Sequence, residues 1–414
     1  MLELLKNNRM FRRLMGYRIF SGLGGGIFSF FIMLSVHLMY GNPIFTGITG
    51  VLIAGPQIFA FTVGPIVDRR RKVTIMRVTT LLEFAVIAVL AFTPIIEEVG
   101  VIVMFVAVFL FSWAALFELP ASTALLPQIV PENKIMEANS LIQIAAMSGG
   151  ILVAGGLFVL LGDTEANLTV IYAFSAIFLA IAFLFSVFIK DPNAPDKTKQ
   201  KSNYIQDLKE GGRFIRKNVL LFITIALVAE MFFMEIAGVN RPAFLETHVG
   251  ARGYVVFTMT ALVGGILASS LMGFLGKNFK TGWMISVLFA IAGVARILFA
   301  FVLPHSYAGG LATMVVYATL GSALGIIMMS LRQRIPQKDM VGRVDTITTT
   351  FSSIAITVGA LVGGFLGSAV ADVANVFMYQ GIALVTISLF TILVPSIRKL
   401  PKINDISNEE ETEG

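Results

Sequence analysis

The chain has 414 residues, of which 56% are hydrophobic and 14% charged, and its mean hydropathy is +0.84. A water-soluble domain of this composition would lack a polar surface, so the composition excludes an ordinary soluble protein. The net charge of +6 does not indicate binding of nucleic acid, because the basic residues gather in a few short loops. The chain has no cysteine, and its three histidines are far apart in sequence. We therefore expect no disulfide, no metal site and no cofactor.

Long apolar segments follow one another along the whole chain. A helix needs about 20 mostly apolar residues to span a bilayer. Twelve windows meet this requirement, near residues 14–40, 44–67, 74–95, 101–126, 136–161, 168–189, 218–245, 253–276, 281–303, 308–331, 343–370 and 374–395. We therefore predict an all-α integral membrane protein with twelve transmembrane helices.

The basic residues give the orientation of these helices. If the twelve helices alternate in direction, 27 of the 31 lysines and arginines fall on one side of the membrane. Loops rich in lysine and arginine stay in the cytoplasm. We predict a multi-pass protein of the cell (cytoplasmic) membrane with both termini in the cytoplasm.

The longest polar segment divides the chain near its middle, and the two halves look like diverged copies. The loop at residues 131–139 resembles the loop at residues 336–343, which follows 205 residues later. Such an internal repeat predicts two pseudo-symmetric six-helix bundles facing one central cavity. We assign a first bundle to 1–189, a cytoplasmic linker with an amphipathic helix to 190–217, a second bundle to 218–397 and an acidic tail to 398–414.

A cluster of charges lies in the short loop between the second and third windows. Its pattern, Gly-x-x-x-Asp-Arg followed by basic residues, resembles the signature loop of major facilitator superfamily transporters, although Arg71 replaces the second glycine that many members carry. The resemblance implies the major facilitator fold and a gating role for this loop, in which Asp68 caps the start of the eleventh helix near Arg343 and breaking the contact favours the inward-open state. The alternative is a basic anchor without a moving role. The gating residues are Gly64, Asp68, Arg69, Arg71, Lys72 and Arg343.

Other segments narrow the resemblance to one branch of that superfamily. The stretches 12–14, 20–24, 120–122, 126–131, 138–141 and 208–215 are similar to the macrolide-efflux and enterobactin-exporter branch of drug–proton antiporters. This resemblance implies a monomeric transporter whose partners are a small-molecule substrate, protons and the lipid bilayer. The fifth window departs from the antiporter pattern, because Ile151 and Leu152 stand where Gly-Pro is expected.

Six charged residues fall at membrane depth, where charge is costly and usually functional. Glu118 is the first choice for a proton site, because Pro120 loosens the backbone beside it. Ion pairing, for example of Glu235 with Arg241 or Arg296, is the alternative explanation. The proton and substrate candidates are Glu118, Glu230, Glu235, Glu83, Arg296 and Arg241.

Two further groups of residues have a proposed role inside the membrane. An adaptable aromatic and methionine-rich surface suits amphiphilic ligands, and the cavity candidates are Met231, Phe232, Phe233 and Met234. Small residues at i, i+4 spacing allow helices to approach closely. They either serve packing alone or, in the transporter interpretation, slide against the opposite bundle. The helix-packing candidates are Gly150, Gly155, Gly156, Gly359, Gly363 and Gly367.

The sequence therefore predicts a secondary-active transporter that works by alternating access and exports amphiphilic drugs or other small molecules in exchange for protons. The alternative is a siderophore, lysolipid or glycolipid exporter or flippase of the same fold. We expect no enzyme and no catalytic residue, because the chain has no nucleotide loop, no metal cluster and no nucleophile with a nearby base.

Overall fold

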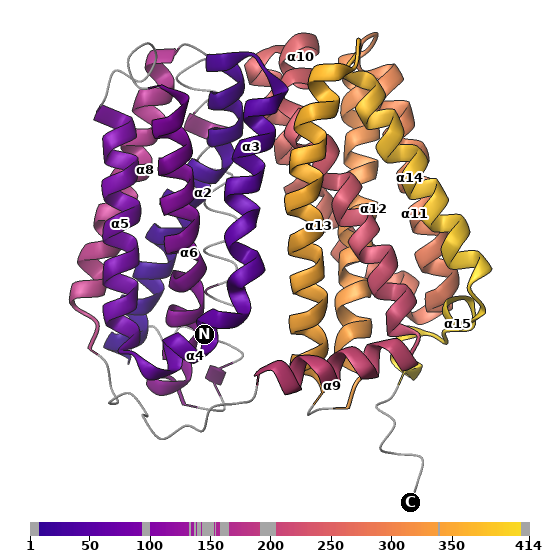
Figure 1. Cartoon of the computed structure of the whole chain (residues 1–414), viewed down its shortest axis with the longest axis horizontal. Helices are drawn as coiled ribbons and strands as arrows, with labels where there is room; N and C mark the ends of the chain where they lie inside the picture. The colour runs from indigo at the N-terminus through magenta and orange to yellow at the C-terminus, as the bar shows by residue number, and fades with distance from the viewer. Residues whose placement is uncertain are drawn as a thin grey trace, which may run out of the picture. The chain divides into compact units, whose positions relative to one another are not determined.

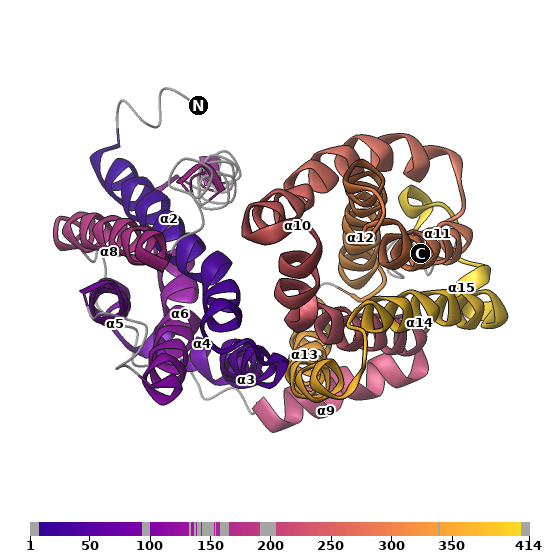
Figure 2. The same ribbon diagram turned by 90° about the horizontal axis from the view of Figure 1, so that it is seen from above.

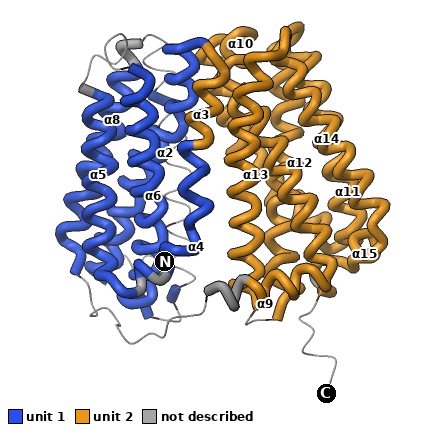
Figure 3. The backbone as a smooth tube through the Cα atoms, viewed as in Figure 1, with its two compact units in different colours: residues 1–41, 52–199 blue, residues 42–51, 200–414 orange. Residues whose placement is uncertain are grey.

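The structure is a computed structural model that describes residues 8–92, 100–131, 165–190, 204–337 and 340–406, with isolated residues between 134 and 157 (Figure 1). All regular elements within these residues are helices. The chain divides into two compact units, the first formed by residues 1–41 and 52–199 and the second by residues 42–51 and 200–414 (Figure 3).

The first unit is built from helices that span the first part of the chain. They are α2 (Arg9–Tyr40), the end of α3 (Pro43–Ala54), the 3₁₀ turn η1 (Gly55–Phe59), α4 (Ala60–Arg69), α5 (Lys72–Phe92), α6 (Val101–Ile129) and α8 (Glu165–Val187). Helix α2 ends at Gly41, whose φ of 64° lets its N–H donate to His37 O. The predicted second span is interrupted by η1, because Pro56 has no N–H to continue the α-helical ladder.

The second unit contains the start of α3 and all later elements. They are α9 (Tyr204–Lys217), α10 (Leu220–Asn278), α11 (Thr281–Val302), α12 (Tyr307–Arg334), α13 (Val341–Ala369), α14 (Ala374–Leu393), α15 (Pro395–Arg398) and η3 (Ile403–Asp405). The predicted amphipathic linker helix corresponds to α9.

Ten stretches of helix among the described residues are long and apolar enough to cross a membrane. One of them, α10, has 59 residues, about three times the length that a bilayer needs. It is broken at Gly250, whose φ of 69° and ψ of 176° are not helical. This break lies between the predicted spans 218–245 and 253–276, so the described residues contain eleven of the twelve predicted spans. The remaining window, 136–161, lies largely outside the described residues.

Helix packing in the first unit joins segments that are distant in sequence. Helix α2 lies beside α8, and α5 lies beside both α6 and α8 (Figure 2). Ser175 Oγ of α8 donates to Gly24 O of α2 at 2.7 Å, which is possible because Gly24 has no side chain to separate the helices. Phe11, Leu14 and Leu125 are fully buried in the core of this unit.

In the second unit, α11 packs against α12 and α14, and α10 packs against α12 and α13. Phe289, Leu324 and Leu331 are fully buried in the core of this unit. The connector helix α9 is held to α13 by Gly211, which lies against Arg343 and Ile347. The amphipathic linker is therefore docked on the second unit.

The glycine stripe of α13 packs mainly on α10. Gly359, Gly363 and Gly367 lie against α10 of the same unit, and a Cβ added at Gly363 would be 2.8 Å from Ile236 Cα. Asn240 fixes this contact, since its Nδ2 donates to both Ile236 O and Gly363 O at 2.8 Å. The stripe therefore packs on α10, and Gly367 also lies against Pro43 of α3.

A second small-residue face of α13 contacts α3. Gly364 lies against Gly47, where an added Cβ on Gly47 would be 2.7 Å from Gly364 Cα. Gly364 follows Gly363 of the predicted stripe in the sequence and therefore lies on a neighbouring face of α13. Through this contact the first turns of α3 belong to the second unit.

We expect Gly363→Val to destabilise the protein by about 1–3 kcal/mol, because the new side chain has no space beside Ile236. Thermal unfolding in detergent measures this effect. Gly321→Val on α12 is the matched control, since nothing lies within 4 Å of a Cβ added there. Equal unfolding temperatures for the two variants would contradict the packing of α13 on α10.

Candidate functional site

Two glutamates of the first unit face each other inside the membrane-spanning region. Glu83 comes from the middle of α5 and is 2% exposed, while Glu118 comes from α6 two residues before Pro120 and is half-buried. Their carboxyl groups are close enough to interact electrostatically. Within the described part of the chain, neither carboxyl group has a basic partner at salt-bridge distance. Glu83 and Glu118 therefore form an acidic pair, which we name the carboxyl pair.

Three hydroxyl groups surround the carboxyl pair. Ser21 Oγ of α2 donates to Glu118 Oε1 at 3.0 Å, and the Tyr17 hydroxyl is 2.8 Å from Thr80 Oγ1. Tyr17 is fully buried and interacts with both glutamates. Ser21, Tyr17 and Thr80 are uncharged and belong to no known motif. Sequence reasoning therefore did not find them.

Arg18 lies one helical turn from Ser21 but does not neutralise Glu118. Its guanidinium group donates to Ser122 Oγ at 2.6 Å, and Ser122 Oγ donates to Leu119 O. The bonds Ser21–Glu118 and Arg18–Ser122 therefore tie α2 to α6 at two successive turns. They hold the carboxyl pair beside α2 and leave its acidic groups without a fixed counter-charge in the described residues.

The second unit contains two more predicted acidic residues. Glu235 of α10 lies where α10 meets α3 and α13, with its carboxyl group next to Gly238 and the position of Gly50. It interacts electrostatically with Arg241, but the described residues include no ion pair between the two. Arg241 Nε is buried and has no hydrogen-bond partner within the described part. Glu230 lies on α10 five residues before Glu235 and therefore on a different side of the helix.

Arg296 is enclosed by side chains of three helices rather than paired with a carboxylate. It is 1% exposed, its Nε donates to Gln380 Oε1, and Gln380 Nε2 donates to the Tyr317 hydroxyl at 2.9 Å. Its Cζ lies 4.5 Å from the ring centroid of Tyr317 and 4.7 Å from that of Phe377. Cation–π contacts and hydrogen bonds compensate for its loss of water. In this arrangement Arg296 joins α11, α12 and α14, and the ion pair with Glu235 is absent from the described residues.

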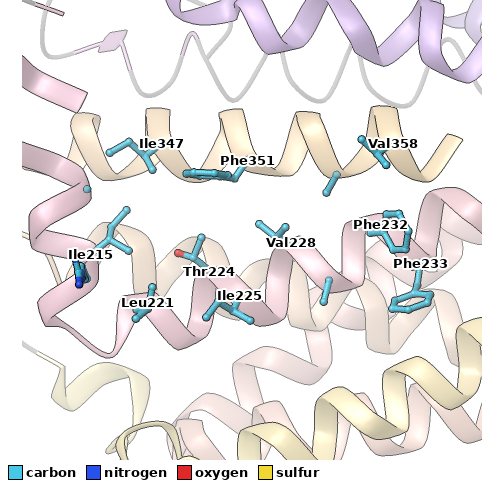
Figure 4. A pocket seen from close by; sticks show the side chains of 14 residues that line it. Ile215, Leu221, Thr224, Ile225, Val228, Phe232, Phe233, Ile347, Phe351 and Val358 are labelled. Carbon is cyan, nitrogen blue, oxygen red and sulfur yellow. The ribbon is translucent and has the colours of Figure 1, made fainter. Parts of the chain in front are cut away.

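A large apolar groove lies on the second unit (Figure 4). Its volume is about 740 Å³, and its walls come from α9, α10 and α13. The cavity candidates Phe232 and Phe233 line it, together with Phe351 and Val358 of α13, whereas Met231 and Met234 are not among its lining residues. Phe351 is 53% exposed and Val358 is 45% exposed, so the groove is open to ligands. The sequence did not indicate Phe351, because α13 carries no second aromatic residue near it.

The predicted gating loop is described only in part. Gly64 is exposed, Arg69 ends α4 and Lys72 begins α5, while the side chain of Asp68 lies outside the described residues. Arg343 at the start of α13 forms an ion pair with Glu210 of α9, a partner that the sequence did not indicate. The capping role of Asp68 stays a prediction. Gly150 also lies outside the described residues, whereas Gly155 is buried and Gly156 is exposed.

A sequence profile for the Major Facilitator Superfamily matches residues 14–360. Macrolide efflux protein A from Streptococcus pyogenes is 23% identical over 351 residues, which cover 83% of this chain and 85% of the relative. Enterobactin exporter EntS from Escherichia coli O1:K1 / APEC is 22% identical over 404 residues, which cover 95% of this chain and 93% of the relative.

Solved structures have the same fold. The nucleoside transporter NupG matches with a TM-score of 0.70 at 14% identity, covering 92% of this chain and 98% of that chain. A second match is a bacterial homolog of the human lysosomal transporter Spinster in an inward-facing and unoccupied conformation. Its TM-score is 0.69 at 12% identity, and the match covers 95% of this chain and 97% of that chain. At this identity the likeness concerns the fold alone.

We expect Arg296→Lys to lower the unfolding temperature in detergent by several degrees, because an ammonium group cannot both stack on the rings and reproduce the guanidinium hydrogen bonds. A variant that unfolds like the wild type but transports less would contradict this structural role of Arg296. It would return Arg296 to the substrate candidates.

Proposed function

Because this chain belongs to the major facilitator superfamily and is a membrane transporter rather than an enzyme, we propose that it exports amphiphilic small molecules in exchange for protons. The observation that carries this proposal is the carboxyl pair of Glu83 and Glu118. The fold supports alternating access, in which a site near the membrane midplane opens to each side in turn.

The carboxyl pair is suited to carry a proton. An isolated charge in an apolar surrounding is costly, and two negative charges side by side repel each other. At least one glutamate therefore holds a proton while the site is closed to water. When the site opens to the cytoplasm, water solvates the second charge and the proton leaves. Ser21 and Tyr17 hold the acidic groups in place during this exchange.

The apolar groove supports the substrate class. Phe232, Phe233 and Phe351 offer ring faces and edges, which suit a ligand with a large hydrophobic part. The surface of the groove is almost entirely apolar, which suits the hydrophobic part of an amphiphile. The similarity to macrolide efflux protein A agrees with this chemistry.

A siderophore, lysolipid or glycolipid is the second candidate substrate. The similarity to the enterobactin exporter covers 95% of this chain, whereas the similarity to macrolide efflux protein A covers 83% of it. Gradient-driven uptake of a siderophore or a lysolipid, in place of drugs, in the liposome assay below would favour this second candidate.

We expect purified protein in liposomes to accumulate lipophilic cations or macrolides when a pH gradient is imposed. Glu83→Gln and Glu118→Gln should each lower this uptake by roughly tenfold or more, because an amide cannot release a proton. Glu246→Gln is the control, because it makes the same substitution on α10 of the second unit and leaves the carboxyl pair intact. Full gradient-driven uptake by both variants would overturn the proton role of the pair.

In the same assay, substrate that binds in the groove should depend on its aromatic walls. We expect Phe232→Ala and Phe351→Ala to raise the KM for the drug by roughly 5- to 30-fold, corresponding to about 1–2 kcal/mol of lost contact. Phe274→Ala is the matched control, since Phe274 is 62% exposed on α10 and does not line the groove. Unchanged KM values would exclude the groove as the substrate site.

A further inference from the structure

A second groove lies on the first unit, at one end of α5. Its volume is about 480 Å³. Arg70 and Arg71 line one end, and Ile75, Val78 and Phe117 line the rest. The groove therefore joins two cationic groups to an apolar channel.

The two arginines lie at the membrane surface. Helix α4 ends at Arg69 and continues the candidate membrane span Pro43–Gly64, and α5 begins at Lys72 with the next candidate span. Arg70 and Arg71 occupy the link between them, so their side chains are at the level of the lipid headgroups. Both are exposed.

Arg70 and Arg71 differ from a neighbouring arginine in their partners. Arg77 donates from its guanidinium group to Ser186 O, Val187 O and Ile189 O, which ties α5 to the end of α8. Neither Arg70 nor Arg71 has an ion pair or side-chain hydrogen bond in the described part of the chain. Their positive charges are therefore available to a ligand.

The apolar part of the groove points into the hydrocarbon layer. The lining residues of α5 run from Thr74 to Thr79, so at about 1.5 Å per residue the groove follows this helix for about 8 Å. Val78 is 61% exposed. Thr79 Oγ1 donates to Ile75 O and Met76 O of its own helix, which satisfies its hydroxyl group and leaves its methyl group for apolar contact. This surface suits an acyl chain.

We propose that this groove binds an anionic phospholipid. The phosphate accepts hydrogen bonds from the guanidinium groups of Arg70 and Arg71, whose planar donors match phosphate oxygens. One acyl chain lies along Ile75 and Val78 against Phe117. The proposal is independent of the proton-coupled export described above, since it requires only that the first unit spans a bilayer.

Trp113 provides a probe for the test. It lies one turn from Phe117 on the same face of α6, and it is one of two tryptophans in the chain. Trp283→Phe leaves Trp113 as the single tryptophan. The full-length variant is reconstituted in phosphatidylcholine, and phosphatidylglycerol or phosphatidylcholine with brominated acyl chains, which quench tryptophan on contact, is added at equal mole fraction.

We expect brominated phosphatidylglycerol to quench Trp113 with at least about fivefold higher relative affinity than brominated phosphatidylcholine. Arg70→Ala and Arg71→Ala, made together, should remove this preference. Arg69→Ala is the matched control, because it removes an exposed charge beside the groove without removing a lining residue. Equal quenching by the two lipids in the parent, or equal loss of preference in Arg69→Ala, would overturn the proposal.

A second pair of variants tests the apolar channel with all charges intact. Val78→Phe should fill the groove and remove the preference, whereas Val89→Phe, at another exposed position of α5, should keep it. The same behaviour in both would mean that the groove does not hold the acyl chain. Soluble glycerol phosphate should not reduce the quenching by brominated phosphatidylglycerol. If it does, the site binds a free phosphate rather than a lipid, and the proposal is overturned.

Discussion

The cost of placing charge in a hydrocarbon layer governs this protein. Each ionisable side chain at membrane depth must be neutral, paired or surrounded by groups that replace water. Arg296 meets the requirement with three aromatic rings and the amide of Gln380. Glu83 has no such compensation in the described residues, and its nearest charged neighbour is another acid, Glu118. This contrast between Arg296 and Glu83 is the reason for proposing that the glutamate, and not the arginine, exchanges a proton.

The two units use their interiors in different ways. In the first, hydroxyl groups from α2 and α5 gather around the carboxyl pair, which supports proton exchange. In the second, α10 and α13 approach closely where glycines permit it, and beside that contact they form an apolar groove lined by aromatic rings.

Hydropathy predicted most of the fold, because spanning helices must be about 20 apolar residues long, and the break at Gly250 falls between two predicted spans. Partners were harder to predict. Glu83 and Glu118 were both candidates, but nothing in the sequence indicates that α5 brings one to the other. Gln380 carries no charge, so no pattern connected it to Arg296. A glycine stripe shows that another helix is close but does not identify that helix, so the packing of Gly363 on α10 could not be predicted from the sequence.

The central claim is that the carboxyl pair releases a proton when substrate drives the transporter through its cycle. The most direct measurement is the release of protons from purified protein in weakly buffered detergent solution on addition of a transported drug. The account predicts a substrate-dependent release in the wild type that disappears in the variant combining Glu83→Gln with Glu118→Gln, although the drug still binds. Undiminished release from that variant would contradict the account and move the proton site to the second unit.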